Sequence, residues 1–271
     1  MSKTNSNSTL FLIDGSTFIF RAYFAMYKAS QSRGSGFTRS DGTPTGAVMA
    51  FCNMMWKIIT NGIDGIHPSH IAVIFDTKEK TFRSDIYPLY KANRDAPPED
   101  LIPQFPLIHK AVEAFNIKCI SQIGYEADDL IATYSKIATK RNIKTIIISG
   151  DKDLMQLIDN NVRMYDPMPG KERFIDINGV QDKFGVAPDK VVDVQALAGD
   201  TTDNIPGVPG IGVKIASELI NEYHTLEGLL SNAKEIKQNK RRENLLKYAE
   251  DARISYPVSY THLTLPTIYS V

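Results

Sequence analysis

LFLID, residues 10–14, consists of four apolar residues followed by an aspartate, and two later runs are likewise followed by an aspartate within three residues. The apolar runs are Leu10–Ile13, Ile71–Phe75 and Thr145–Ile148. Each run is too short and too continuously apolar for a surface helix. This pattern predicts three buried, parallel strands.

Patterns of helical spacing separate these predicted strands. The apolar positions that recur at this spacing are Val48, Phe51, Met55 and Ile58, then Ile108, Val112 and Phe115, then Leu130, Ile131, Tyr134, Ile137 and Ala138. Strands that alternate with helices predict an α/β fold, in which helices cover both faces of a mostly parallel central sheet.

The composition is that of an ordinary globular chain of 271 residues, in which 31 basic and 31 acidic residues cancel. Basic residues are nevertheless concentrated in two segments, with five between Lys78 and Arg94 and six between Lys234 and Lys247. The isolated Cys52 and Cys119 suit a reducing compartment, and the sequence shows no signal peptide and no membrane-spanning run. We expect a cytoplasmic protein with no membrane partner.

Two regions depart from the strand and helix alternation. Residues 77–106 are rich in proline, tyrosine and basic residues, which indicates an excursion from the sheet. From about Val186 onward the patterns are helical, interrupted by the turn-rich NIPGVPGIG at residues 204–212. We therefore predict a first domain over residues 1–185 and a helical subdomain over residues 186–256.

Acidic residues follow all three predicted strands: Asp14, Asp76, and the pair Asp151 and Asp153. Sites in open α/β sheets form at the carboxyl ends of strands, so these acids should lie at one edge. A single aspartate there is as often a helix cap or an Asx turn. Four acids exceed what capping requires.

Further acids occur in GYEADDL, residues 124–130, and in GDTTDN, residues 199–204. Glu126, Asp128 and Asp129 precede a helical pattern, so the positive end of a helix is the simpler explanation for them. Together with Asp200, Asp203 and the strand-end acids, however, they would repel one another unless cations were bound. Carboxylate oxygens without cysteine or paired histidine favour two Mg²⁺ or Mn²⁺ ions, whose chemistry is phosphoryl transfer.

Five motifs, in this order, resemble the 5′-to-3′ exonuclease domain of bacterial DNA polymerase I, in the flap endonuclease family. They are LIDGSTFIFRAYFA, VIFDTKEKTFRSDIYPLYKANR, GYEADDLIATY, SGDKDLMQL and LAGDTTDNIPGVPGIGVKIA. The resemblance implies a PIN-like nuclease domain with a helical arch at about residues 77–106, followed by a helix-hairpin-helix subdomain.

The resemblance also implies the metal ligands. Asp14, Asp76, Glu126 and Asp128 would serve mainly the first ion, and Asp151, Asp153 and Asp203 the second. Asp129 and Asp200 would act through bridging waters.

Contacts to DNA are implied in the same way. Lys91, Arg94 and Arg21 would contact the scissile phosphate as catalytic cations. The implied DNA-binding residues are Arg83, Tyr90, Gly207, Gly210, Gly212 and Lys214, and the family's hairpin also binds K⁺. For Arg83 an ordinary solvated position is an equal alternative, and for Tyr90 simple packing is the commoner one.

The expected function is metal-dependent 5′-to-3′ exonuclease and flap endonuclease activity on DNA with a 5′ flap, nick or 5′ end, in primer removal and repair. The resemblance also implies a bacterial, nucleoid-associated monomer that is free-standing, fused to a DNA polymerase or acting with one. The alternatives are a non-catalytic DNA-binding relative and a phosphatase of the haloacid dehalogenase class, which would need an acid where Leu12 stands. The charge-free PVSYTHLTLPTIYSV, residues 257–271, is interpreted as a tail that is not native and has no function.

Overall fold

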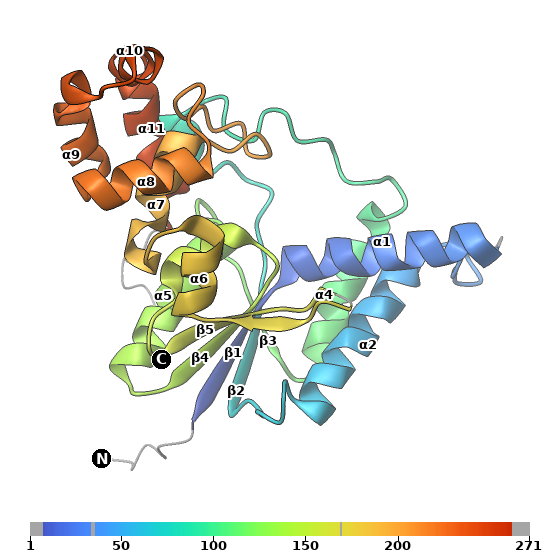
Figure 1. The fold of residues 1–271 in the computed structure, drawn as a ribbon. Coiled ribbons are helices and arrows are strands. Elements are labelled where there is room, and N and C mark those ends of the chain that lie inside the picture. Colours follow the sequence, from blue (N-terminus) through green and yellow to red (C-terminus); the bar gives the residue numbers. More distant parts are fainter. Residues whose placement is uncertain (1–7, 34–35, 169, 262–271) are drawn as a thin grey trace. The chain divides into compact units, whose positions relative to one another are not determined.

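The central sheet is seen in a computed structural model, which describes residues 8–33, 36–168 and 170–261. Its strand order in this part of the chain is β3-β2-β1-β4-β5-β6 (Figure 1). The strands are β1 (Thr9–Asp14), β2 (His70–Ile74), β3 (Lys118–Ile120), β4 (Lys144–Ile148), β5 (Val162–Asp166) and β6 (Arg173–Ile175). The three strands that the apolar runs predict are confirmed as β1, β2 and β4.

The register of the central strands decides what lies at their carboxyl ends. β1 pairs in parallel with β2 on one side and with β4 on the other. Asp14 lies opposite Ile74 of β2, and Ile13 lies opposite Ile148 of β4. The residues that follow these strands therefore begin at the same edge of the sheet.

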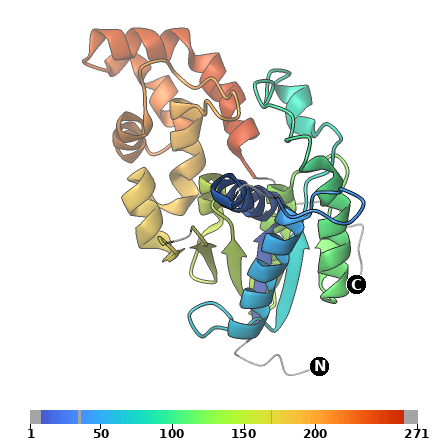
Figure 2. The same cartoon turned by 90° about the vertical axis from the view of Figure 1, so that its right-hand side faces the viewer.

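Four helices pack around these strands because each has one apolar face. They are α1 (Gly15–Arg33), α2 (Gly46–Asn61), α4 (Phe105–Ala114) and α5 (Ala127–Lys140). α5 lies on one face of the sheet, whereas α1, α2 and α4 lie on the other (Figures 1 and 2). The predicted α/β fold, with a mostly parallel sheet covered on both faces, is confirmed.

The chain divides into two compact units. The first contains residues 1–77, 96–150 and 165–173, and the second contains residues 78–95, 151–164 and 174–271. β1 to β4 belong wholly to the first unit, and the division runs through β5 and β6. Residues 78–95 and 151–164 cluster with the C-terminal helices. The domain boundary at residue 185 stays a prediction.

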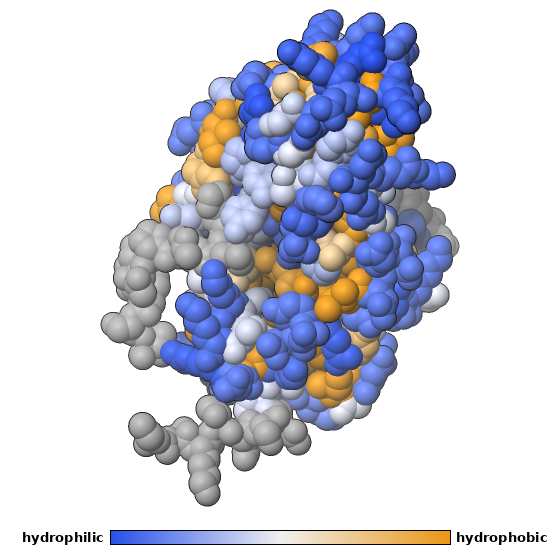
Figure 3. Space-filling model, turned by 60° about the vertical axis from the view of Figure 1, so that its left-hand side comes forward, coloured by the Kyte–Doolittle hydropathy of each residue, from blue (hydrophilic) through white to orange (hydrophobic). Residues whose placement is uncertain are grey.

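The second unit is helical from residue 177 to residue 259, as expected. Its α-helices are α3 (Phe82–Ile86), α6 (Ile177–Phe184), α7 (Val191–Ala198), α8 (Val213–Tyr223), α9 (Leu226–Ser231), α10 (Asn239–Lys247) and α11 (Ala249–Ser259). The 3₁₀ turns of the chain are η1 (Ile102–Gln104), η2 (Lys152–Leu157), η3 (Pro188–Lys190) and η4 (Ala233–Glu235). Lys240 and Lys247 of α10 are exposed, and the surface at the top of Figure 3, over the C-terminal helices, is mostly hydrophilic.

The predicted arch, residues 77–106, contains the five-residue helix α3 and the turn η1, with loops between them. The predicted tail begins inside α11, which continues to Ser259 with Pro257 in its last turn. Val258 and Ser259 are buried, and residues 262–271 lie outside the described part of the chain. That the tail is not native stays a prediction, although its first residues are packed against the second unit.

Candidate active site

The predicted acids fall into two sets, one in each unit. We name them the first acid group, which is Asp14, Asp76, Glu126, Asp128 and Asp129, and the second acid group, which is Asp151, Asp153, Asp200 and Asp203. The residues that the resemblance assigns to the first ion all lie in the first acid group, and those that it assigns to the second ion all lie in the second acid group.

Asp14, the last residue of β1, is 4% exposed and is surrounded by hydroxyl and amide donors. The Thr17 amide donates to Oδ1 at 3.0 Å, and the hydroxyls of Thr17 and Ser149 donate to Oδ2 at 2.5 and 2.7 Å. Burial raises the pKa of the Asp14 carboxyl even though these hydrogen bonds act in the opposite direction. A bound cation would relieve this cost of desolvation.

Asp76 follows β2 by two residues and joins the sheet to α5. Its Oδ1 accepts from the Ala127 amide at 2.8 Å, and its Oδ2 accepts from the Ser16 hydroxyl at 2.6 Å. The carboxylate is thus fixed at the positive end of α5, where a negative charge is favoured.

Glu126 and Asp129 form a reciprocal capping box at the start of α5. The Glu126 amide donates to Asp129 Oδ2 at 3.0 Å, and Asp129 is fully buried. Asp128 lies between them and is partly exposed. The simple capping explanation is therefore correct for two of the three acids, and Asp128 is the one left accessible.

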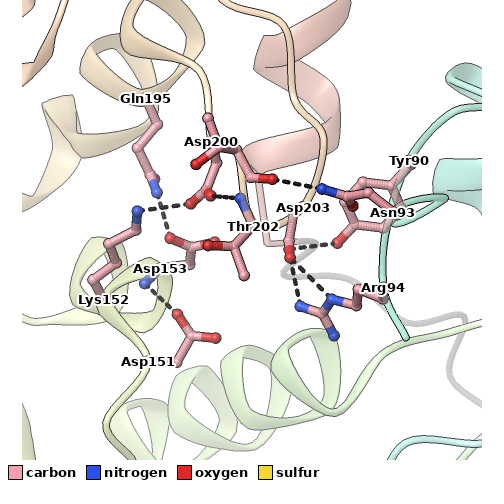
Figure 4. Close-up of polar contacts among 11 residues, drawn as sticks. Tyr90, Asn93, Arg94, Asp151, Lys152, Asp153, Gln195, Asp200, Thr202 and Asp203 are labelled. Carbon is pink, nitrogen blue, oxygen red and sulfur yellow. Dashed lines mark hydrogen bonds and ion pairs between the residues drawn. The ribbon is translucent and has the colours of Figure 1, made fainter. Parts of the chain in front are cut away.

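The second acid group lies on η2 and on the loop after α7 (Figure 4). Asp151 caps η2 by accepting from the Asp153 amide at 2.9 Å. Asp153 Oδ1 in turn accepts from Nε2 of Gln195, a buried residue of α7, at 2.5 Å. Two elements distant in the sequence are joined through this carboxylate.

Asp200 and Asp203 sit in a tight loop that two backbone hydrogen bonds close. The Asp200 amide donates to the Ile205 carbonyl at 2.9 Å, and the Ile205 amide donates back at 2.7 Å. The backbones of Gly199 and Gly207 approach so closely that a Cβ on Gly207 would lie 2.4 Å from the Gly199 amide nitrogen. Only glycine permits this approach at φ 59°.

Two cations neutralise this loop. Lys152 Nζ lies 2.7 Å from Asp200 Oδ2, and Arg94 donates from Nη2 and Nε to Asp203 Oδ1 at 2.5 and 3.2 Å. Figure 4 shows that the two side chains come from different segments and point to different carboxylates. Asp200 and Asp203 are thus each paired with a cationic side chain.

The KANR segment, residues 91–94, is held against the same loop. The Lys91 amide donates to the Asp203 carbonyl at 2.9 Å, and Asn93 Nδ2 donates to the Thr201 carbonyl at 2.7 Å. Lys91 has a φ of 55°, a conformation unfavourable for a residue with a side chain. Its ammonium group lies over the Tyr90 ring, 4.9 Å from the centroid. This strained backbone, over-determined by its neighbours, marks a candidate functional segment.

The electrostatics differ among these carboxyls. Burial, together with the neighbouring Asp151 charge, raises the pKa of Asp153 to about 7, and burial also raises the pKa of Asp151. For Asp200, burial is outweighed by the hydrogen bonds from Lys152 and the Thr202 amide, so its pKa is lowered. Asp153 is therefore the member whose negative charge is least compensated by the protein.

Within the described ranges, no three acidic, histidine or cysteine side chains converge closely enough to hold a metal ion. The donor chemistry nevertheless fits a hard divalent cation, because each group offers several carboxylate oxygens and includes a buried carboxyl with a raised pKa.

The other predicted residues have varied surroundings. Arg21 of α1 lies 3.4 Å from Asp166, and its buried Nη1 donates to none of the described residues. The Tyr90 hydroxyl lies 3.4 Å from Asp203 Oδ2. Arg83 is 2% exposed and donates to the Val258 and Tyr260 carbonyls at 2.9 and 3.0 Å. The equal alternative of a solvated Arg83 is wrong, and these contacts favour an anchoring role over a phosphate contact.

In the turn before α8, Gly207 and Gly210 have left-handed backbones, with φ 59° and 80°. Gly212, by contrast, is the N-cap of α8 with an extended backbone, which any residue could adopt. Asn244 of α10 donates to the Pro209 carbonyl at 2.8 Å and holds the turn from outside. Lys214 is exposed in the first turn of α8.

Several residues of the site were missed in the sequence. Ser149, Thr17 and Gln195 carry no signal of their own, because a hydroxyl or an amide becomes a carboxylate donor only through tertiary placement. Lys152 could have been found, since it lies between two predicted ligands in GDKD. No helix in the described ranges is both long and apolar enough to cross a lipid bilayer.

Comparison with known proteins identifies the family. A sequence model described as 5′-3′ exonuclease, N-terminal resolvase-like domain, matches residues 9–185. A second, described as 5′-3′ exonuclease, C-terminal SAM fold, matches residues 186–269. The chain belongs to the 5′-3′ exonuclease family. It is an enzyme of the nuclease class, as the resemblance predicted, and the haloacid dehalogenase alternative is excluded.

Relatives of this exonuclease are bacterial DNA polymerases I. The protein of Rhizobium leguminosarum is 51% identical over 91% of the chain, and that of Thermus thermophilus is 36% identical over 94%. The matches cover only 24% and 29% of those proteins. The exonuclease chain thus spans about a quarter of the curated relatives it matches.

Solved structures share the fold of this exonuclease. A flap endonuclease of bacteriophage T5, in a complex with DNA and metal ions, has a TM-score of 0.74 at 21% identity, with 93% of this chain and 88% of that one covered. Flap endonuclease-1 of Methanococcus jannaschii has a TM-score of 0.56 at 17% identity, with 92% and 78% covered. At these identities the likeness concerns the fold.

Proposed function

We propose that this exonuclease hydrolyses DNA phosphodiesters at 5′ ends, nicks and 5′-flap junctions, using two divalent cations, Mg²⁺ or Mn²⁺. The observation that carries the proposal is the pair of acid groups, each of which includes a desolvated carboxyl with a raised pKa. Capping accounts for Asp129, Glu126 and Asp151, whereas the buried carboxylates of Asp14 and Asp153 accept only from neutral hydroxyl and amide groups among the described residues. Bound cations would supply Lewis-acid stabilisation of the attacking and leaving oxygens.

The first cation would be held by Asp14, Asp76, Glu126 and Asp128, and the second by Asp151, Asp153 and Asp203. Asp129 and Asp200 would act on the cations through bridging waters. This assignment is supported by the hydrogen bond of Asp129 with the Glu126 amide and by the ion pair of Asp200 with Lys152. A solved structure of the T5 5′-exonuclease with divalent metal ions (zinc) bound supports a divalent cation here. The choice between Mg²⁺ and Mn²⁺ is part of the proposal.

Lys91, Arg94 and Arg21 would contact the scissile phosphate and stabilise its developing charge. Arg94 would exchange its ion pair with Asp203 for the phosphate once that carboxylate binds a cation. Tyr90 would stack on a base, since its ring stands in the same segment.

The turn at Gly207, Gly210 and Gly212, together with Lys214, would bind the phosphate backbone of duplex DNA. The backbone amides at the N-terminus of α8 favour a phosphate, and K⁺ would bind the carbonyls of the turn. Arg83 would act on DNA indirectly, through the anchoring of α3. The basic α10 beside this turn supports a phosphate-binding surface.

A 5′-labelled flap substrate tests the proposal. Wild-type protein with Mg²⁺ should release short 5′ fragments, EDTA should abolish the release, and Asp128→Asn should be inert although it binds the flap. Protein that binds the flap but never cuts it would contradict the proposed reaction at flap junctions. Fusion to a polymerase and roles in primer removal and repair belong to the same proposal and are supported by the polymerase relatives. Action as a monomer is proposed with them.

A further inference from the structure

α7 is almost entirely apolar and buried, apart from two polar side chains. Val191, Val192, Val194, Ala196 and Leu197 are all at most 4% exposed. Asp193 has an evident structural task, because it accepts from the Leu226 amide at 2.8 Å at the start of α9. Gln195, 5% exposed, performs no such capping. An apolar side chain of the same length would fill its place without desolvating an amide.

The amide of Gln195 is only half used. Its Nε2 donates to Asp153, whereas its buried Oε1 accepts from none of the described residues. A buried acceptor without a partner is destabilising. The side chain is therefore retained at a cost to stability, which points to the donor group as its purpose.

The nature of this donor matters for the second acid group. Asp200 and Asp203 are each held by a cationic side chain, which cancels charge as well as fixing orientation. The Asp153 carboxylate accepts no other side-chain hydrogen bond among the described residues, since Gln156 donates to the Asp153 backbone carbonyl instead. A neutral amide orients a carboxylate and leaves its full charge available to a metal ion.

We infer that Gln195 is a positioning residue for the second cation: it holds the Asp153 carboxylate, through Nε2, in the orientation in which that carboxylate binds the ion. The inference rests on the proposed function, because it requires a cation at the second acid group. It adds a residue from the helical subdomain to a site whose predicted ligands all come from acidic motifs.

The test compares Mn²⁺ affinity, measured by calorimetry and electron paramagnetic resonance, in wild type and Gln195→Met. Methionine keeps the length and removes the donor, so we expect about tenfold weaker binding at one of two sites. The same substitution in an Asp153→Asn background should change the Mn²⁺ affinity less than twofold, because its effect passes through the Asp153 carboxylate.

Gln104→Met is the matched control. Gln104 is equally buried and caps α2 in the first unit, so its loss should lower thermal stability and leave Mn²⁺ affinity unchanged.

The inference is overturned if Gln195→Met binds Mn²⁺ as tightly as the wild type. It is also overturned if Gln195→Met weakens Mn²⁺ binding equally in the wild-type and Asp153→Asn backgrounds, because the substitution would then act through the fold and not through Asp153. If Gln195→Met does not fold, Gln195→Asn serves instead, since it keeps an amide on a side chain one methylene too short to reach Asp153. Wild-type protein that binds no Mn²⁺ would overturn the proposed function together with this inference. If only the inference about Gln195 is wrong, the wild-type protein still binds Mn²⁺ at two sites, so the two failures can be distinguished.

Discussion

The two acid groups are built in opposite ways. Asp14 of the first group ends a central strand and is surrounded by hydroxyl and amide donors, among them Ser149. Asp203 of the second lies in a loop and is paired with Arg94. Asp14 is positioned by the register of the sheet, whereas Asp200 and Asp203 are positioned by ion pairs and by the glycine contact in their loop.

This difference teaches that one chain can assemble carboxylates by two physical routes. Strand pairing fixes positions through many backbone hydrogen bonds and needs no compensating charge. A loop lacks that framework, so cations such as Lys152 and Arg94 both order it and offset its charge. The second group should therefore respond more strongly to changes in its neighbours than the first.

The largest expected effects come from the acids themselves. Asp14→Asn and Asp153→Asn should each reduce flap cleavage about 1000-fold or more, because each removes a charge that a divalent cation requires. Thermal unfolding without metal should show neither variant to be less stable than wild type, since both remove a desolvated carboxylate. Nearly full cleavage in either variant would remove that residue from the site.

Arg94→Gln is expected to reduce cleavage about 300-fold, the scale of losing one preorganised donor to a transition-state charge. The matched control is Arg39→Gln, since Arg39 is exposed and lies 3.9 Å from Asp41 on the surface of the first unit. A loss of flap binding equal to the loss of rate would mean that Arg94 binds substrate without acting on the reaction. Single-turnover rates with saturating enzyme separate the two cases.

Metal binding at the second group should depend on pH. Burial and the Asp151 charge raise the pKa of Asp153 to about 7 from 3.8, so the folded state holds this proton more tightly than the unfolded chain. The contribution of Asp153 to the free energy of unfolding is therefore greatest below about pH 4 and is lost as the pH rises through 7. A cation competes with the same proton, so Mn²⁺ affinity at pH 5 should be roughly 100-fold weaker than at pH 8.

Calorimetric titration at the two pH values measures this dependence. In Asp153→Asn, the Mn²⁺ affinity of the second site should vary less with pH, because only the other acids of that site still exchange protons. An affinity that is equal at pH 5 and pH 8 in wild type would contradict the assignment of Asp153 as a ligand.

The smallest effect concerns the loop that carries Asp200 and Asp203. Gly207→Ala should lower the free energy of unfolding by about 2 kcal/mol, because its Cβ would collide with Gly199 at a left-handed φ. Gly42→Ala is the control, with a left-handed φ of 84° and nothing within 4 Å, and should cost about 1 kcal/mol. Urea denaturation measures both. Equal losses would mean that backbone strain alone, and not the glycine contact, shapes the loop.

Much of this architecture could be predicted from the sequence. The runs that became β1, β2 and β4 are continuous enough to exclude a surface helix, and each is followed by an acid. β3, β5 and β6 were not predicted, because Lys118–Ile120 and Arg173–Ile175 are three residues long and Val162–Asp166 mixes polar with apolar positions. Strands of that kind are stabilised by their neighbours rather than by their own composition.

The sequence by itself determined which residues carry negative charge, that they follow buried strands or precede a helix, and to which family the chain belongs. Only the tertiary structure decided which donor holds each carboxylate. Ser149 reaches Asp14 across 135 positions and Gln195 reaches Asp153 across 42, and strand register and helix packing set both contacts. A carboxylate is recognisable from its own chemistry, whereas an orienting hydroxyl or amide acquires its role from the atom the fold places opposite it.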